Sequence, residues 1–137
     1  IGLPIPGTVC RIVDLVDRDL DVPVGTPGEL LSQGPQVMKG YLGLPDETAG
    51  ALKDGWLRTG DVATMDEDGF FFIVDRIKDM IIRGGENIYP KEIEDFLYTH
   101  PDVRDVQVVG VPDMTYGEAV LAVVIRKEGS QVTEEAL

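Results

Sequence analysis

The stretch "IVDRIKDMIIRGGENIYPKEIE", residues 73–94, decides how the chain is divided. It starts in an apolar run, continues through a cluster of charges at 75–79 and the pair Gly84-Gly85, and then begins a helix at Pro90. Proline at the first helical position followed by acidic residues is typical of a helix N-terminus. A plain connection between a strand and a helix needs none of the earlier features. We therefore interpret residues 75–79 as a hinge and the Gly-Gly segment as a ligand-binding loop.

Residues 1–76 have the pattern of successive strands with little helix. Strands are predicted for "TVCRIVD" (8–14), "GELLSQG" (28–34), "GWLRTGDVATM" (55–65) and "GFFFIVD" (69–75). The last two face each other across an Asp-Gly turn, which is a strong hairpin signal because such turns need positive φ. Residues 46–54 read as a short helix or turn. This order predicts a small barrel or a curled sheet.

Residues 77–137 predict a different arrangement. The short strand "MIIRGG" precedes a helix "PKEIEDFLYTH" (90–100), which Pro101 ends. Strands at 103–112 and 119–127 follow, and Thr133 has the pattern of the N-cap of a second helix. The helix carries apolar residues at helical spacing, which we expect to form one stripe: Ile93, Phe96, Leu97 and His100.

The predicted fold class is therefore α+β. A small β-barrel-like piece, residues 1–76, is followed by the hinge at 75–79 and by an α+β lobe, residues 77–137. The lobe is expected to hold a small sheet with its helices on one face.

Composition excludes several classes of function. The chain of 137 residues has 12 Lys and Arg against 25 Asp and Glu, a formal net charge of −13, so nucleic acid is not an expected partner. The single cysteine, Cys10, predicts a reducing compartment, the cytoplasm, and sits in a strand as a packed small side chain rather than a nucleophile. No apolar run approaches the roughly 18 residues of a membrane span, which leaves peripheral membrane association open.

Two segments carry residues suited to a nucleotide. Asp61 follows a Gly turn in "WLRTGD", where a carboxylate can accept two hydrogen bonds from a vicinal diol such as a ribose; the alternative is a turn aspartate that caps local N–H groups. Arg76 has a planar fork that can donate to ribose or phosphate oxygens; the alternative is a surface ion pair with Asp75 or Asp79.

The remaining candidates are weaker when taken singly. Lys78 has the plain alternative of a solvated lysine. The Gly84-Gly85 loop permits close passage of a thin ligand but lacks the spacing of either glycine-rich nucleotide fingerprint. His100, the only histidine, reads as a residue at the C-terminal end of a helix rather than a catalytic base. No Cys/His cluster offers a metal site, so no metal ligands are predicted.

The order of the motifs is more specific than any one of them. "GELLSQGPQVMKGY", then "DGWLRTGD", then "DEDGFFFIVDRIKDMIIRGGENIYPKEIE" resembles the C-terminal third of the adenylate-forming superfamily, specifically the AMP-forming acyl-CoA synthetases. The resemblance extends from "IGLPIPGT" to "VVGVPDMTYGEAVLAVVI", nearly the whole chain.

The resemblance implies roles for individual residues. Asp61 matches the aspartate that holds the ribose hydroxyls of ATP or acyl-AMP, and Arg76 matches an arginine that also contacts the ribose. Lys78 matches the hinge residue about which the small lobe rotates between an adenylation and a thioester-forming pose. Gly84 and Gly85 match the loop that lines the pantetheine channel in the second pose.

The activity that the resemblance implies is an ATP- and Mg²⁺-dependent ligation of a carboxylic acid, fatty or otherwise apolar, to CoA through acyl-AMP. The alternatives are an adenylation domain that loads a carrier protein, a luciferase-like enzyme, and a non-catalytic module that retains the fold. "GGENIYP" resembles the CoA ligases more than the carrier-loading domains.

The resemblance also implies that the chain is part of a longer protein. The phosphate loop, the Mg²⁺-binding glutamate and the acyl pocket are expected upstream, and the adenylation lysine downstream. No catalytic residue is thus expected within these residues, the isolated chain is expected to be inactive, and its remaining partner is the rest of its own protein. The chain starts at Ile1 without Met and stops soon after Thr133, which agrees with this expectation. Its oligomeric state stays open.

Overall fold

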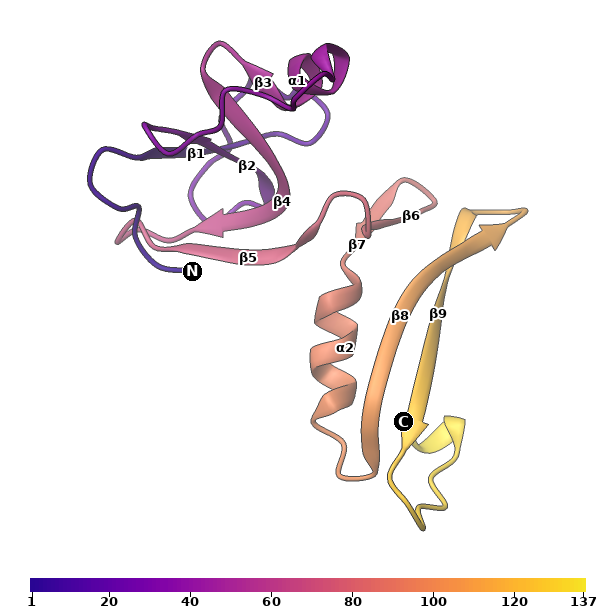
Figure 1. The fold of residues 1–137 in the computed structure, drawn as a ribbon. Coiled ribbons are helices and arrows are strands. Elements are labelled where there is room, and N and C mark those ends of the chain that lie inside the picture. The colour runs from indigo at the N-terminus through magenta and orange to yellow at the C-terminus, as the bar shows by residue number, and fades with distance from the viewer. The chain divides into compact units, whose positions relative to one another are not determined.

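The computed structural model describes all 137 residues, which form two compact units, Ile1–Ile77 and Lys78–Leu137 (Figure 1). The division falls within the charged segment 75–79. Strands dominate both units, and each has one α-helix, so the predicted α+β class is confirmed. None of the helices has the length and apolar character that a membrane crossing requires.

The first unit is a curled antiparallel sheet with a long central strand. Its elements are β1 (Val9–Val13), β2 (Gly28–Gln33), α1 (Pro45–Ala51), β3 (Leu52–Lys53), β4 (Trp56–Met65) and β5 (Phe71–Arg76). β4 pairs with β2, β3 and β5, whereas β1 pairs only with β2. No ladder joins β1 to β5, so the sheet curls without closing into a barrel.

The core of the first unit is formed by side chains from four strands of this sheet. Its buried side chains are Ile12, Leu30, Ala63 and Phe71. Cys10 packs against them as a partly buried side chain, as predicted. The predicted hairpin is also confirmed. Asp66 Oδ1 accepts the N–H groups of Asp68 at 3.0 Å and Phe70 at 2.8 Å, and Gly69 has φ +82°.

The second unit is a four-stranded antiparallel sheet of order β7-β6-β9-β8. Its elements are β6 (Ile81–Arg83), β7 (Glu86–Ile88), α2 (Pro90–Tyr98), β8 (Val103–Asp113), β9 (Gly117–Arg126) and the 3₁₀ turn η1 (Glu134–Ala136). The sequence did not predict β7, which takes the place of part of the expected loop. The helix expected near Thr133 is present only as η1, and the Thr133 side chain makes no capping hydrogen bond.

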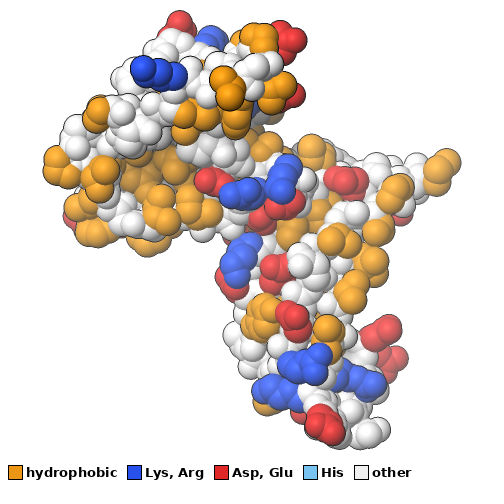
Figure 2. Space-filling model, in the orientation of Figure 1, with side chains coloured by type: hydrophobic (Ala, Val, Ile, Leu, Met, Phe, Trp, Pro, Cys, Tyr) orange, Lys and Arg blue, Asp and Glu red, His pale blue; other side chains and the backbone are white.

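The helix α2 covers one face of the second sheet. Leu97 is buried among Ile81, Val103, Val106 and Val108, with Ile93 packed beside it. The other face of β9 remains apolar and exposed at Leu121, Val123 and Ile125. Figure 2 shows further exposed apolar side chains in both units.

The predicted apolar stripe on this helix is correct in part. Ile93 and Leu97, four residues apart, face the sheet, but Phe96 is 68% exposed. The helix ends at Tyr98, earlier than predicted, so His100 lies beyond it and its Nδ1 accepts the N–H of Asp102 at 3.2 Å. Glu94 fixes the helix to β8, because its Oε1 accepts the backbone N–H of Val108 at 2.9 Å.

Leu97 and Phe96 provide a matched pair for testing this packing. Leu97→Ala should lower the free energy of unfolding by about 3 kcal/mol, because it opens a cavity in the core under α2. Phe96→Ala should lower it by less than about 1 kcal/mol, since the ring already contacts water. Urea unfolding followed by circular dichroism measures both. Equal losses would show that Phe96 is also part of a packed face.

Candidate functional site

The segment Thr59-Gly60-Asp61 forms a bulge in β4. Glu29 of β2 pairs with Val62, and Leu31 pairs with Arg58, so the single residue between them on β2 faces three residues on β4. Gly60 has φ +75°, a conformation that L side chains rarely adopt. Bulges of this kind bend a strand and change where its side chains point.

Thr59 holds the bulge in place from inside. Its Oγ1 donates to the carbonyl oxygen of Leu30 at 2.8 Å and accepts the N–H of Asp61 at 3.1 Å. The carbonyl of Gly60 accepts the N–H of Ile77 at 2.9 Å. Backbone groups that the bulge removes from the strand ladder are thereby satisfied. The carboxylate of Asp61 caps none of them, so the alternative of a local turn cap does not hold.

Asp61 and Arg76 meet across the β4–β5 pair. They are register partners, and Arg76 Nε lies 3.3 Å from Asp61 Oδ1. β5 has its own irregularity here: Val62 pairs with Asp75, but Ala63 pairs with Ile73, which leaves Val74 extra. The structure thus brings together the two residues predicted to contact a ribose. The guanidinium of Arg76 thus forms an ion pair with Asp61.

The Asp61–Arg76 pair is accessible. The side chain of Asp61 is 26% exposed and that of Arg76 is 61% exposed. An exposed ion pair of this kind contributes little to stability. Replacing this ion pair by contacts with a polar ligand therefore costs little folding free energy.

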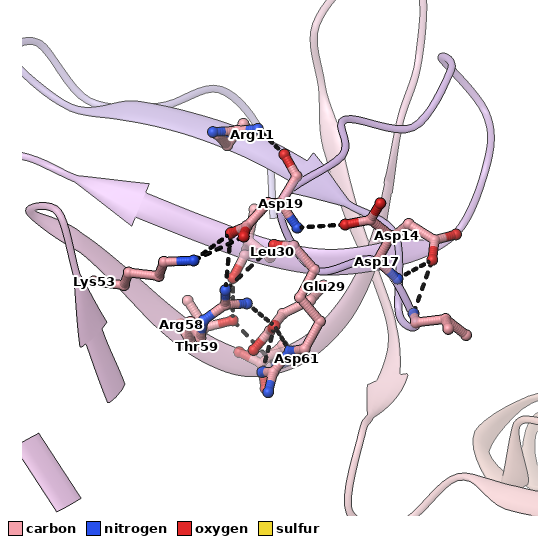
Figure 3. A network of polar contacts seen from close by, with 12 residues as sticks. Arg11, Asp14, Asp17, Asp19, Glu29, Leu30, Lys53, Arg58, Thr59 and Asp61 are labelled. Carbon is pink, nitrogen blue, oxygen red and sulfur yellow. Dashed lines mark hydrogen bonds and ion pairs between the residues drawn. The ribbon is translucent and has the colours of Figure 1, made fainter. Parts of the chain in front are cut away.

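Sequence reasoning missed a buried charge next to this bulge, shown in Figure 3. Glu29 is fully buried in β2, and its Oε2 accepts hydrogen bonds from Arg18 Nε at 3.0 Å, Arg18 Nη2 at 2.6 Å and Arg58 Nη1 at 2.9 Å. A buried carboxylate must be paired to be tolerated. The sequence signal that could have revealed this network is Glu29 inside the apolar run "GELL", together with Arg58 in the partner strand.

An outer layer of charges continues this network. Asp19 lies 3.6 Å from Arg58 Nη2 and accepts hydrogen bonds from Lys53 Nζ at 2.8 and 2.7 Å. The hydrogen bond and charge of Lys53 lower the pKa of Asp19 below its ordinary value. An open cleft of about 600 Å³ borders the network and is lined in part by Glu29, Arg58, Thr59 and Gly60. The network therefore joins β2 and β4 where the bulge separates them.

The segment around Gly84 and Gly85 is a tight hairpin turn rather than an open loop. Arg83 and Glu86 are register partners of β6 and β7, and the two glycines have φ +61° and +90°. Positive φ at both positions defines the turn type that suits a two-residue hairpin. A Cβ on Gly84 would lie 3.3 Å from Tyr116 Cδ1, whereas a Cβ on Gly85 would meet nothing within 4 Å. Gly85 therefore has open space for a ligand beside it.

Lys78 is the first residue of the second unit and is exposed. β5 ends at Arg76 and β6 begins at Ile81, so Lys78 lies in a short connection without strand pairing. This setting permits a change of backbone angles at Lys78. A hinge role for it stays a prediction.

The chain is similar to known proteins over its whole length. Residues 92–137 match the family described as the AMP-binding enzyme C-terminal domain. The chain is 55% identical over its whole length to a long-chain-fatty-acid–CoA ligase of Escherichia coli O6:H1, of which it covers 24%. It is 54% identical over 85% of its length to a feruloyl-CoA synthase of Amycolatopsis sp, again covering 24%. The chain thus spans about a quarter of the curated relatives it matches.

A solved structure agrees with these matches. MatB from Rhodopseudomonas palustris with ATP bound superimposes with a TM-score of 0.93 at 39% identity, over 99% of this chain and 27% of that one. The resemblance to the adenylate-forming superfamily is therefore confirmed.

The buried network can be tested by removing one partner. Arg58→Met should lower the free energy of unfolding by about 3 kcal/mol, because it leaves the buried Glu29 carboxylate with one guanidinium instead of two. Lys53→Met should change it by less than about 1 kcal/mol, since its ion pair with Asp19 is exposed. Urea unfolding at neutral pH measures both variants. A small effect of Arg58→Met would show that Glu29 is adequately paired by Arg18 alone.

Proposed function

We propose that this chain is part of the C-terminal region of an ATP-dependent carboxylic acid–CoA ligase of the adenylate-forming superfamily. One observation carries the proposal: two strand irregularities bring Asp61 and Arg76 together as an accessible acid–base pair. The similarity to CoA ligases, which extends over the whole of this chain, gives this pair its expected ligand, the ribose of ATP and of acyl-AMP.

The pair suits a ribose because of its chemistry. An ionised carboxylate has two oxygens, and a vicinal diol presents two O–H donors at matching spacing. On binding, Asp61 accepts both ribose hydroxyls, and Arg76 donates from its planar fork to ribose oxygens. The bulge fixed by Thr59 holds Asp61 in position before the nucleotide arrives, which reduces the entropy lost on binding.

In the proposed reaction, a carboxylate oxygen of the acid attacks the α-phosphorus of ATP and pyrophosphate leaves. The CoA thiolate then attacks the acyl carbonyl of acyl-AMP, and AMP leaves. The residues of this chain hold the nucleotide through both steps and admit the thiol arm beside Gly84 and Gly85. Lys78 provides the pivot by which the second unit changes pose between the steps, a gating role known in hinged enzymes.

The names of the relatives suggest the class of acid substrate. We propose an apolar carboxylic acid, with a fatty acid first, because the long-chain-fatty-acid–CoA ligases match over the whole chain. We place the enzyme in the cytoplasm, where ATP and CoA are supplied. Mg²⁺ is proposed as the companion of the ATP phosphates. This chain has no group of three His, Cys, Asp or Glu suited to a metal, so none of its residues is assigned to the ion.

The proposal is tested with the full-length protein that carries this chain. Given ATP, Mg²⁺, CoA and a panel of apolar acids, it should release pyrophosphate, AMP and CoA thioester in equal amounts. Asp61→Ala should depress acyl-adenylate formation and thioester formation together, because the ribose stays bound throughout. Acylation of a carrier protein without CoA turnover would favour a carrier-loading domain. Absence of acid-dependent pyrophosphate exchange would favour a non-catalytic module.

The hinge has a separate test. Lys78→Pro fixes φ near −65° and should restrict the change of pose. Acyl-adenylate formation, read by pyrophosphate exchange, should persist, whereas thioester formation should fall at least about tenfold, an added barrier of about 1.4 kcal/mol. Lys78→Ala removes the charge but leaves φ free, so it should retain both half-reactions far better. An equal loss in both half-reactions of Lys78→Pro would indicate misfolding rather than a pivot.

A further inference from the structure

Arg83 differs from the arginines of the first unit. Those four arginines all pair with carboxylates: Arg11 with Asp21, Arg18 and Arg58 with Glu29, and Arg76 with Asp61.

Arg83 ends β6 directly before the Gly84-Gly85 turn, and its guanidinium carbon lies 4.3 Å from the ring centroid of Tyr116. It is exposed and forms no ion pair, in a chain with a net charge of −13. Its exposed guanidinium, stacked on a ring, is therefore available for an anionic ligand.

The backbone of Tyr116, whose ring lies under Arg83, is held by hydrogen bonds. The carbonyl oxygen of Tyr116 accepts the N–H of Gly84 at 2.9 Å, and its own N–H donates to Asp113 Oδ1 at 2.8 Å. Asp113 Oδ1 also accepts the N–H of Thr115 at 2.9 Å. The turn between β8 and β9 and the turn between β6 and β7 are therefore joined at this point. The guanidinium is oriented before any ligand binds, which lowers the entropic cost of using it.

Stacking on the Tyr116 ring leaves the N–H donors of the Arg83 guanidinium free to bind a ligand. Contact with the ring occupies one face of the planar group, whereas its N–H donors lie in the plane and point away from the ring. Two parallel N–H groups match two oxygens of a phosphate, a geometry that a lysine ammonium cannot reproduce. The arrangement selects a phosphate or a similar oxyanion over a neutral group.

We propose that Arg83, held on Tyr116, binds a phosphate group of CoA and so anchors the nucleotide half of the thiol substrate. The inference rests on the proposed function, which places the pantetheine arm at the adjacent Gly84-Gly85 turn. CoA carries its phosphates on the nucleotide half and none on pantetheine. Arg83 thereby discriminates CoA from shorter thiols that would fit the same turn.

Asp113 tunes this contact. The backbone N–H groups of Tyr116 and Thr115 hold the pKa of its carboxyl below the ordinary value, and the nearby charge of Arg83 contributes. Asp113 is therefore ionised at neutral pH and sets a negative charge near the phosphate position. An asparagine would keep the Oδ1 acceptor that shapes the turn while removing that charge.

The test uses the full-length enzyme and three thiols: CoA, dephospho-CoA and pantetheine. Arg83→Ala should raise the KM for CoA by about tenfold, which corresponds to about 1.4 kcal/mol of lost binding free energy, and leave the KM for pantetheine unchanged. Arg83→Lys should fall between the wild type and Arg83→Ala, because it keeps the charge but loses the fork. Arg104→Ala, which removes an exposed arginine of β8, is the matched control and should leave both KM values unchanged.

Dephospho-CoA shows which phosphate of CoA Arg83 contacts, and the Asp113→Asn variant tests the effect of the nearby negative charge. If Arg83→Ala raises the KM for dephospho-CoA as well, the contact is to the diphosphate; if only CoA is affected, the contact is to the 3′-phosphate. Asp113→Asn should act in the opposite direction and lower the KM for CoA by about twofold at low ionic strength, an effect that added salt removes.

Several outcomes would overturn the inference. An equal rise in the KM values of CoA and pantetheine in Arg83→Ala would show that Arg83 only shapes the turn. An unchanged KM for CoA in both Arg83 variants would show that no phosphate is bound there. Either result leaves the proposed function standing, as long as the wild type forms the thioester. Failure of the wild type to form any thioester would instead remove the proposed function itself.

Discussion

The bulge in β4 is the constraint on which the first unit depends. A regular antiparallel strand would continue its ladder past residues 59–61, whereas here one residue of β2 faces three of β4. The extra length is accommodated only because Gly60 adopts φ +75° and because Thr59 bonds in both directions, to Leu30 and to Asp61. The accessible carboxylate of Asp61 is a product of this local geometry.

The buried charges beside the bulge follow from the same constraint. A bulge removes ladder hydrogen bonds between two strands, so something else must hold the strands together there. Glu29 and Arg58 lie on either side of the interrupted ladder and join β2 to β4 through a desolvated ion pair. Such a pair adds little net stability compared with apolar packing, but it is costly to break. Its geometry suits it to fixing the register of β2 against β4.

Much of this could be predicted from the sequence, and the misses have physical reasons. The β4–β5 hairpin was predicted because Asp-Gly between apolar runs has few other solutions. The nucleotide-binding role of Asp61 and Arg76, which the order of several motifs indicated, stays a prediction. β7 was missed because three residues with two polar side chains, Glu86 and Asn87, give no periodicity. The contact between Glu29 and Arg18 depends on chain segments meeting in space, which residue patterns do not encode. Phe96 was misplaced because only a narrow face of α2 packs on β8.

The two candidate sites have the same kind of local structure. Each is a backbone irregularity that glycine permits, with an arginine held beside it: Gly60 with Arg76 across the strand pair, and Gly84-Gly85 with Arg83 on Tyr116. Glycine opens the backbone to a ligand but adds flexibility, so the neighbouring contacts must restore order. Thr59 does so at the first site, and the joined turns of Tyr116 and Asp113 do so at the second. In a chain with a net charge of −13, an arginine held beside open backbone is the feature that the two candidate sites have in common.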